Sequence, residues 1–317
     1  MTREHRSAQL AVVFLTLATS SNEVRRIFVT FLLKQAPTDV KLIGSPDRVD
    51  SLYSVIFSVI NALGIGVLLL LEARASAFRE QWKDRTRTRR NLLFLVSSLL
   101  TGGLLHAGVA YLTQVIPRLT WSAALWVQLP AVFLIAELFN WVLHWAKHQN
   151  AFMWRMHCQH HRDDRFTVWL TAHTWGPEVF VSGMVMSSII LAAGFAPITL
   201  DVYLLFYSLV NLYQHSANPY SLGFLDKLII NPAFHRHHHG GEQMNYGSTL
   251  SVWDWVFGTV VWPKNRHVKI EPPAVESSRE PFGWAAEMLY PLIPSRWVPS
   301  AMDEPGMSVE KLMRRQS

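Results

Sequence analysis

The 317-residue chain has little cysteine and little charge, and both shortages limit what it can be. Its one cysteine, Cys158, excludes a disulfide framework. Charged residues make up 16% of the chain, whereas soluble domains average about 25%. The sequence also lacks a glycine-rich phosphate loop, a Ser-His-Asp order and an internal repeat. Nothing in it therefore indicates a secreted disulfide scaffold, a phosphate-binding loop or a serine hydrolase.

What the chain has instead is apolar surface. Half of its residues are hydrophobic, 13 are tryptophan, and its mean hydropathy is positive. Its formal net charge of +6 could suggest a nucleic-acid partner. The basic residues lie beside apolar runs, however, and this placement fits an anionic membrane surface better. We therefore expect a lipid bilayer as partner and no nucleic acid.

Apolar segments long enough to cross a bilayer recur along the chain. A proline at 197 separates the last two, which we interpret as a hairpin. The sequence predicts an all-α integral membrane protein with about five transmembrane helices. The expected spans are residues 51–71, 91–116, 121–143, 178–196 and 198–214.

The segment from Glu72 to Arg90 predicts the orientation of these spans, because it contains seven basic residues between two apolar runs. Short loops rich in lysine and arginine remain on the cytoplasmic side. With five passes, this segment and all the histidine-rich segments fall on the same side. We therefore expect a multi-pass protein whose active site lies in a cytosolic helical cap.

The predicted domain organisation has three parts. Residues 1–50 form an N-terminal segment, residues 51–262 the membrane domain, and residues 263–317 a cytosolic tail. The apolar run from Leu10 to Ala18 is too short to span a bilayer. An interfacial helix and a signal peptide both remain open for this N-terminal segment.

Histidine is the most informative residue type in the sequence. Eleven of the 14 histidines lie between His144 and His239, and most are three or four residues apart. On a helix, that spacing places side chains on one face. Each cluster, or box, therefore offers two or three imidazoles to one point, and imidazole binds iron, zinc, copper and nickel. Three boxes plus His215 exceed the capacity of one ion, so the count favours two metals.

Around these histidines the sequence resembles the fatty acid hydroxylase and sterol desaturase superfamily of membrane di-iron enzymes. WRMHCQHHRDD at 154–164 is similar to the second box of that family. LGFLDKLIINPAFHRHHH at 222–239 and MNYGSTLSVWDWVFGT at 244–259 are similar to its third-box region. The resemblance covers roughly residues 120–262. It implies these metal ligands: His144, His148, His157, His160, His161, His215, His235, His238 and His239.

One departure from the family pattern concerns the segment after the second box. The family's histidine there falls on Trp175, and a histidine occurs two residues earlier, at His173. Either His173 replaces the missing group or that site is absent. Further candidates, as additional ligands or as partners of the ligands, are Asn211, Glu178, Asp254, Asp163 and Asp164. We interpret Cys158 as a bystander, and Glu137 as either a functional acid or a structural hydrogen-bond acceptor.

The resemblance implies a membrane-bound monooxygenase that hydroxylates a fatty acyl, sterol or related lipid with O₂. Its cofactors would be two iron ions, with zinc as a possible substitute. An external electron donor such as a cytochrome, ferredoxin or reductase would supply electrons. A lipid or sterol desaturase with the same centre is one alternative. A metal-binding membrane protein without oxygen chemistry is another, from a different class.

Overall fold

A computed structural model of the chain describes residue 60 and residues 63–119, 123–161, 163, 165–240, 243–263 and 284–293. The described residues form helices joined by loops, with one isolated β-bridge between Ile229 and Leu250. The predicted helical class is therefore confirmed over this part of the chain. The interpretation of residues 1–50 lies outside the described residues.

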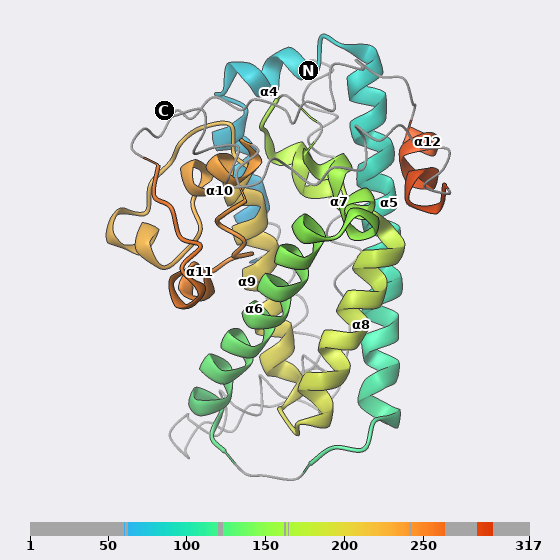
Figure 1. Cartoon of the computed structure of the whole chain (residues 1–317), viewed down its shortest axis with the longest axis vertical. Helices are drawn as coiled ribbons and strands as arrows, with labels where there is room; N and C mark the ends of the chain where they lie inside the picture. Colours follow the sequence, from blue (N-terminus) through green and yellow to red (C-terminus); the bar gives the residue numbers. More distant parts are fainter. Residues whose placement is uncertain are drawn as a thin grey trace, which may run out of the picture. The chain divides into compact units, whose positions relative to one another are not determined.

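Four long helices are labelled in Figure 1: α5 (Arg85–Val115), α6 (Leu125–Gln149), α8 (Gly176–Ala192) and α9 (Pro197–Gln214). Only α5 and α6 are long and apolar enough to qualify as membrane spans among the described residues. At about 1.5 Å per residue, each exceeds the ~30 Å of a hydrocarbon core. The apolar helix Leu63–Glu72 and α8 are shorter.

Shorter elements connect and follow these helices. They are α4 (Ser76–Gln81), α7 (Ala151–His161), η1 (Val168–Ala172), η2 (Gly223–Lys227), α10 (Pro232–His239), α11 (Val252–Phe257), α12 (Trp284–Leu289) and η3 (Tyr290–Leu292).

Two helix boundaries differ from the sequence-based expectation. The basic segment is largely helical, because α4 and the first turns of α5 lie within it. The third expected span does not end at residue 143, since α6 continues to Gln149 and carries His144 and His148. No proline or glycine interrupts α6 after Pro130, so nothing in the sequence stops the helix earlier. Asn150 then begins α7 by accepting a hydrogen bond from the Met153 amide at 3.1 Å.

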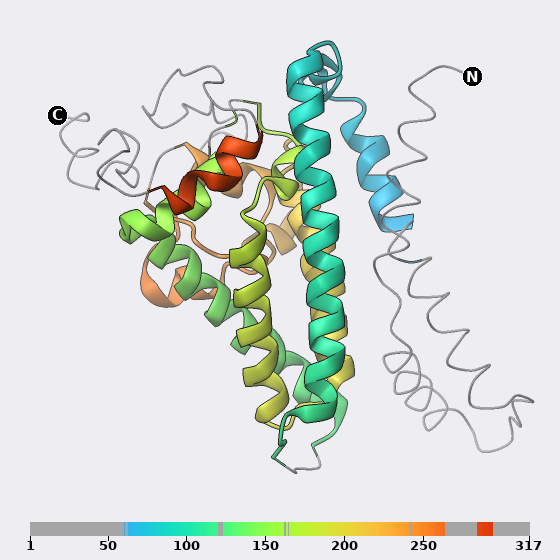
Figure 2. The ribbon, with the colours of Figure 1, turned by 90° about the vertical axis from the view of Figure 1, so that its right-hand side faces the viewer.

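The described chain divides into two compact units. Of the described residues, the first comprises residue 60 and residues 63–67, 99–119, 123–133 and 180–209. Within it, α5 and α8 run alongside one another (Figures 1 and 2). A Cβ atom on Gly183 would lie 2.6 Å from Leu105, and one on Gly108 would lie 2.6 Å from Met184. The two glycines therefore permit this close helix contact.

The outer surface of the first unit is apolar. Large exposed side chains include Leu100, Leu104, Tyr111, Trp126 and Val181. Only 6% of the most apolar stretch of α5 is buried, so this helix is not the core helix of a soluble protein. A continuous exposed apolar surface requires another apolar phase to cover it, and a bilayer supplies one.

The second unit comprises, among the described residues, 68–98, 134–161, 163, 165–179, 210–240, 243–263 and 284–293, and contains every histidine of the three boxes. Asp163 accepts hydrogen bonds from Arg87 and from Arg90, the latter at 3.4 Å. Arg90 also pairs with both carboxylate oxygens of Glu287, at 2.9 and 3.0 Å. Two arginines of the basic segment are thus bound to internal carboxylates and form part of the structure.

Candidate metal centre

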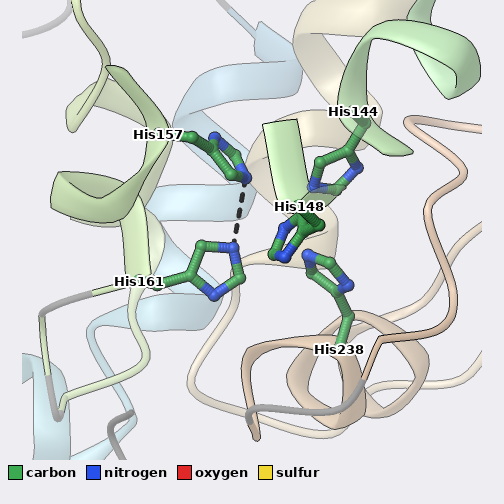
Figure 3. Close-up of side chains that lie close together, drawn as sticks. All are labelled: His144, His148, His157, His161 and His238. Carbon is green, nitrogen blue, oxygen red and sulfur yellow. Dashed lines mark hydrogen bonds between the residues drawn. The ribbon is translucent and has the colours of Figure 1, made fainter. Parts of the chain in front are cut away.

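The nine histidines expected as ligands come together in two buried groups. The five-histidine group contains His144, His148, His157, His161 and His238. The four-histidine group contains His160, His215, His235 and His239. In each group, the potential ligand atoms lie within 4.8 Å of one another. Figure 3 shows the five-histidine group, with rings from α6, α7 and α10 directed toward a common centre.

The structure corrects one detail of the sequence interpretation, in which each box converged on one point. The second box divides, because His157 and His161 join the five-histidine group while His160 joins the other. The third box divides in the same way, with His235 and His239 separated from His238. Successive residues on a helix point about 100° apart. The residues at i+3 and i+4 therefore point in different directions, and i and i+4 can bind one metal while i+3 points toward the other.

Local sequence fixes the orientation of the third box. The Asn231 side chain accepts hydrogen bonds at 3.0 Å from the amides of Ala233 and Phe234, which caps the start of α10. Pro232 occupies the first helical position, where its missing N–H is not needed. The helix ends at Gly240, directly after His239. A helix of only eight residues thus has a defined beginning, and this sets the direction of its three ligand-type side chains.

Backbone carbonyls determine which nitrogen of each ring carries the proton. The Nδ1 atom of His144 lies 2.8 Å from the Tyr246 carbonyl, and that of His238 lies 2.8 Å from the Met244 carbonyl. A carbonyl oxygen can only accept, so Nδ1 donates and Nε2 is left as a bare lone pair. These two Nε2 atoms are buried and lack any hydrogen-bond partner. They are therefore available as metal ligands.

The four-histidine group shows the same arrangement. His160 Nδ1 donates to the Leu170 carbonyl at 3.0 Å, and His215 Nδ1 donates to the Asn211 carbonyl at 2.7 Å. Their Nε2 atoms are nonetheless only 3.1 Å apart. With both Nδ1 atoms protonated, no proton is available to join them, so this contact sets two lone pairs against each other.

A cation between the rings would turn this repulsion into ligation. Metal–imidazole bonds of about 2.1 Å place neighbouring ligand atoms ~3.0 Å apart at right angles and ~3.4 Å apart in a tetrahedron. The Nε2 separations match this range, at 3.1 Å for His157–His161, 2.9 Å for His215–His235 and 3.2 Å for His235–His239. The residues present therefore fit two metal ions bound by nitrogen.

Burial keeps these imidazoles neutral, which metal binding requires. Burial lowers the pKa of His215 and of His238 to about 4. It also lowers the pKa values of other group members outside the long apolar helices well below the usual value, with neighbouring imidazoles adding to the effect. These are His157, His160, His161, His235 and His239.

His173 lies outside both histidine groups. Its ring is completely buried and packs on Phe94, with ring centroids 4.5 Å apart. Its Nε2 atom lies 2.9 Å from Asn91 Oδ1, so Nε2 carries the proton. The Nδ1 atom has no partner. The structure therefore places His173 in a buried polar chain with Asn91 and Gln81, where Asn91 donates to Gln81 at 3.2 Å.

The other candidates have distinct surroundings. Asn211 contributes its backbone carbonyl to His215, while its side chain accepts from Gln214 at 3.2 Å. Glu178 forms an ion pair with Lys147 at 2.9 Å. Glu137 accepts hydrogen bonds from the amide and hydroxyl of Thr249, at 2.9 and 2.6 Å, as its structural interpretation anticipated. Asp164 lies outside the described residues.

Asp254 is fully buried and accepts four hydrogen bonds. Its partners are the Trp141 indole at 3.0 Å, the Tyr246 and Gly247 amides at 2.8 Å and the Thr259 hydroxyl at 2.7 Å. Asp254 therefore contacts the segment that holds the ligand histidines and does not contact the histidines directly.

Sequence reasoning missed Glu72, which it treated as the start of the basic segment. This carboxylate is fully buried and accepts hydrogen bonds from Ser216, Ala217 and Val168. One signal in the sequence was an acidic residue directly after an uncharged apolar run. It also missed the four carbonyls that orient the rings, since every residue has a carbonyl and only the folded backbone selects among them.

Comparison with known proteins supports the resemblance seen in the sequence. Residues 129–259 match the family model described as fatty acid hydroxylase, and these residues include all nine histidines of the two groups. The family model and the curated relatives together support the fatty acid hydroxylase superfamily, as the resemblance predicted. No solved structure matches the chain significantly.

Two curated relatives illustrate the similarity. Human alkylglycerol monooxygenase is 28% identical over 133 residues, which is 41% of this chain and 29% of that protein. Ornithine lipid hydroxylase OlsE of Rhizobium tropici is 26% identical over 223 residues, 64% of this chain and 66% of that protein. The chain thus spans between about a third and two thirds of these relatives. Their names support the predicted class, an oxidoreductase of this superfamily.

Proposed function

We propose that this protein is a membrane-bound di-iron monooxygenase that uses O₂ to hydroxylate a lipid. The observation that carries the proposal is the pair of buried histidine groups in which unprotonated nitrogens face one another. Relatives named as a monooxygenase and a hydroxylase support the reaction class. The apolar surfaces of α5 and α8 support a substrate that reaches the protein through the membrane.

The proposed ligands are the five- and four-histidine groups, one ion to each. First-row metal ions take four to six ligands, so neither group saturates a six-coordinate ion. Imidazole accepts iron and zinc alike, but zinc has no redox chemistry. Two bound iron ions would supply the electrons and the open positions that O₂ activation on an unactivated C–H bond requires.

The protein's own residues prepare the site in three ways. The carbonyls of residues 170, 211, 244 and 246 hold Nδ1 protons and direct Nε2 lone pairs inward. Burial of the rings excludes water, which would otherwise compete as a ligand. Low ring pKa values keep the imidazoles unprotonated at neutral pH.

The proposed reaction replaces one C–H bond of the lipid with C–OH. One atom of O₂ enters the product and the other leaves as water. This balance consumes two electrons and two protons from outside the protein, so an electron donor such as a cytochrome, a ferredoxin or a reductase is required. Both relatives are named for amphiphilic lipids, which favours a substrate with a polar head group.

The proposed organisation follows from the sequence. Residues 51–262 would form the oxygenase domain and residues 263–317 a cytosolic tail. Five passes would place the basic segment and all ligand histidines on the cytoplasmic side. Cysteine-accessibility labelling at Arg85 and Asn150 tests this topology, and labelling of the two positions from opposite sides of the membrane would contradict it.

The test of function is turnover under ¹⁸O₂ with iron-loaded protein, an electron donor and candidate lipids, followed by mass spectrometry. A product that carries one ¹⁸O atom supports the monooxygenase. A product that has lost two hydrogens and carries no label would indicate a desaturase instead. If fully loaded protein forms no O₂-dependent product, a non-enzymatic metal-binding role becomes the better interpretation.

A further inference from the structure

Two buried carboxylates in the second unit, Asp254 and Glu72, hydrogen-bond to the backbone segments that support the histidines. We infer that each positions one metal group: Asp254 positions the five-histidine group and Glu72 the four-histidine group. This inference deepens the proposed function, and rests on it only in that both groups bind metal. Neither carboxylate contacts a ligand ring, so both are positioning residues.

Asp254 acts on the segment from Met244 to Gly247. One of its oxygens accepts from the Tyr246 amide and the other from the Gly247 amide, both at 2.8 Å. The carbonyls of Met244 and Tyr246 are the acceptors for His238 Nδ1 and His144 Nδ1. Gly247 N–H and the Tyr246 carbonyl belong to one peptide group, so Asp254 fixes directly the carbonyl that orients His144. The Met244 carbonyl lies one peptide group further along, where the Asn245 amide donates to the Thr259 carbonyl at 3.0 Å. Asp254 accepts from the Thr259 hydroxyl as well, so it holds that second carbonyl indirectly.

The geometry of this segment shows how closely it follows the carboxylate. Asn245 has a φ of 58°, in the left-handed region that asparagine tolerates better than other residues with side chains. A Cβ atom on Gly247 would lie 2.8 Å from Asp254 Oδ2 and 2.5 Å from the Leu250 carbonyl. The backbone thus passes directly against the carboxylate. Loss of the bond from Asp254 to the Gly247 amide would let the Tyr246 carbonyl move.

Glu72 acts on two other segments. Its carboxylate accepts from the Ser216 hydroxyl at 2.6 Å and from the Ala217 amide at 3.0 Å, directly after His215. It also accepts from the Val168 amide at 3.2 Å, at the start of η1. The third residue of η1 is Leu170, whose carbonyl holds His160 Nδ1. Glu72 therefore anchors the backbone directly after His215 and at the start of the short helix whose Leu170 carbonyl orients His160.

Arg236 reinforces the same segment from α10. Its guanidinium donates to the Ser216 carbonyl at 3.1 Å and to the Ala217 carbonyl at 2.8 Å. It also lies over the Phe166 ring, 4.8 Å from the centroid. The amides and carbonyls after His215 are thus bound by opposite charges. Among the described residues, Asp254 makes no hydrogen bond to the segments that Glu72 holds, and Glu72 makes none to residues 244–247.

The experiment isolates each group and then removes each carboxylate. In a His235→Ala/His239→Ala background only the five-histidine group remains intact. In a His148→Ala/His157→Ala background only the four-histidine group does. Asp254→Asn and Glu72→Gln are introduced into each background of the full-length, detergent-solubilised protein. Metal per chain and iron retention against a competing chelator are then measured.

Losing a partner that orients a metal-bound histidine typically weakens metal affinity 10–100-fold. We expect Asp254→Asn to weaken iron binding by about that factor where the five-histidine group remains, and less than about threefold in the other background. Glu72→Gln should show the opposite pattern. Equal weakening in both backgrounds by either variant would overturn the inference, because it would indicate general loss of structure.

Asp226→Asn is the matched control. Asp226 is a buried carboxylate that accepts from the Ser221 hydroxyl at 2.5 Å and the Leu222 amide at 2.8 Å. It should leave iron binding unchanged in both backgrounds. If Glu72→Gln fails to fold, Ser216→Ala removes a single Glu72 partner and should weaken only the four-histidine group; no effect there would contradict the role of Glu72.

The metal measurements need no turnover, so they separate this inference from the proposed function. A selective pattern without any hydroxylated product would support the positioning roles and refute the monooxygenase. Hydroxylated product together with equal metal loss in both backgrounds would support the monooxygenase and refute the positioning roles.

Discussion

Acidification of the metal-free protein should destabilise the histidine-bearing unit, because its buried imidazoles resist protonation. His215 and His238 have a pKa of about 4 in the folded chain, against an ordinary value of 6.5. Between these values the unfolded chain binds more protons than the folded one. Folding stability therefore rises with pH in this window and is lost as pH falls from 6.5 toward 4.

The magnitude follows from the size of the shift. One pKa unit corresponds to about 1.36 kcal/mol, so lowering the pH from about 7 to about 5 costs roughly 2 kcal/mol for each of these two rings. Together they cost roughly 4 kcal/mol. A destabilisation of about 1 kcal/mol lowers the melting temperature by ~2–4 °C in domains of about 150–250 residues and by less in larger chains, so the melting temperature should fall by several degrees. The other buried histidines act in the same direction.

The assay is thermal unfolding of metal-stripped, detergent-solubilised protein, followed by circular dichroism at both pH values. A His215→Gln/His238→Gln variant serves as control, since glutamine does not titrate and that variant should lose roughly 4 kcal/mol of the pH dependence. A melting temperature that is the same at both pH values would refute the reasoning. So would a pH dependence that survives unchanged in the double variant.

Two further predictions concern single histidines. His238→Ala should lower bound metal, because it removes one ligand of the five-histidine group, whereas His237→Ala should leave it unchanged, because His237 belongs to neither group; metal analysis of both purified variants decides this, and equal losses would contradict the grouping. His173→Ala should keep both metals but lower the melting temperature, because it empties a buried site against Phe94 and leaves Asn91 Oδ1 without its donor; loss of metal would instead make His173 a ligand.

Helical spacing predicted the three histidine boxes, and the family resemblance added the isolated His215 to give the nine expected ligands. Three and four residues are close to one helical turn, so each box had to present its rings along a single stripe. The division of the boxes was also implicit in that geometry, since His160 and His161 must point about 100° apart. The spacing could not predict which histidines from different helices would share a metal group. His238 joins His144 and His148 through contacts 90 or more residues distant, and spacing within one helix says nothing about those.

Helix ends were harder to predict than helix identity. The sequence placed His144 just after a span because its apolar run ends there, yet α6 continues to Gln149. Hydrophobicity reports where a helix leaves the apolar phase, and capping residues report where the backbone stops being helical. Asn150 is the capping signal, and it lies two residues beyond His148. The first box is therefore attached rigidly to a long helix and does not begin a loop.

The sequence could not predict the tautomer of each histidine, that is, which ring nitrogen carries the proton. A histidine becomes a useful ligand only when one nitrogen is protonated away from the metal, and here backbone carbonyls set this for four rings of the two groups. Carbonyls cannot be selected by mutation, so their positions must be held by other side chains. Buried carboxylates that accept from backbone amides are suited to this task. Asp254 holds the peptide group of the Tyr246 carbonyl through the Gly247 amide, and Glu72 holds backbone next to His215 and at the start of η1. Glu72 and Asp254 were difficult to interpret from sequence for this reason. They bind the backbone near the histidines and not the histidine rings themselves, so no motif includes them.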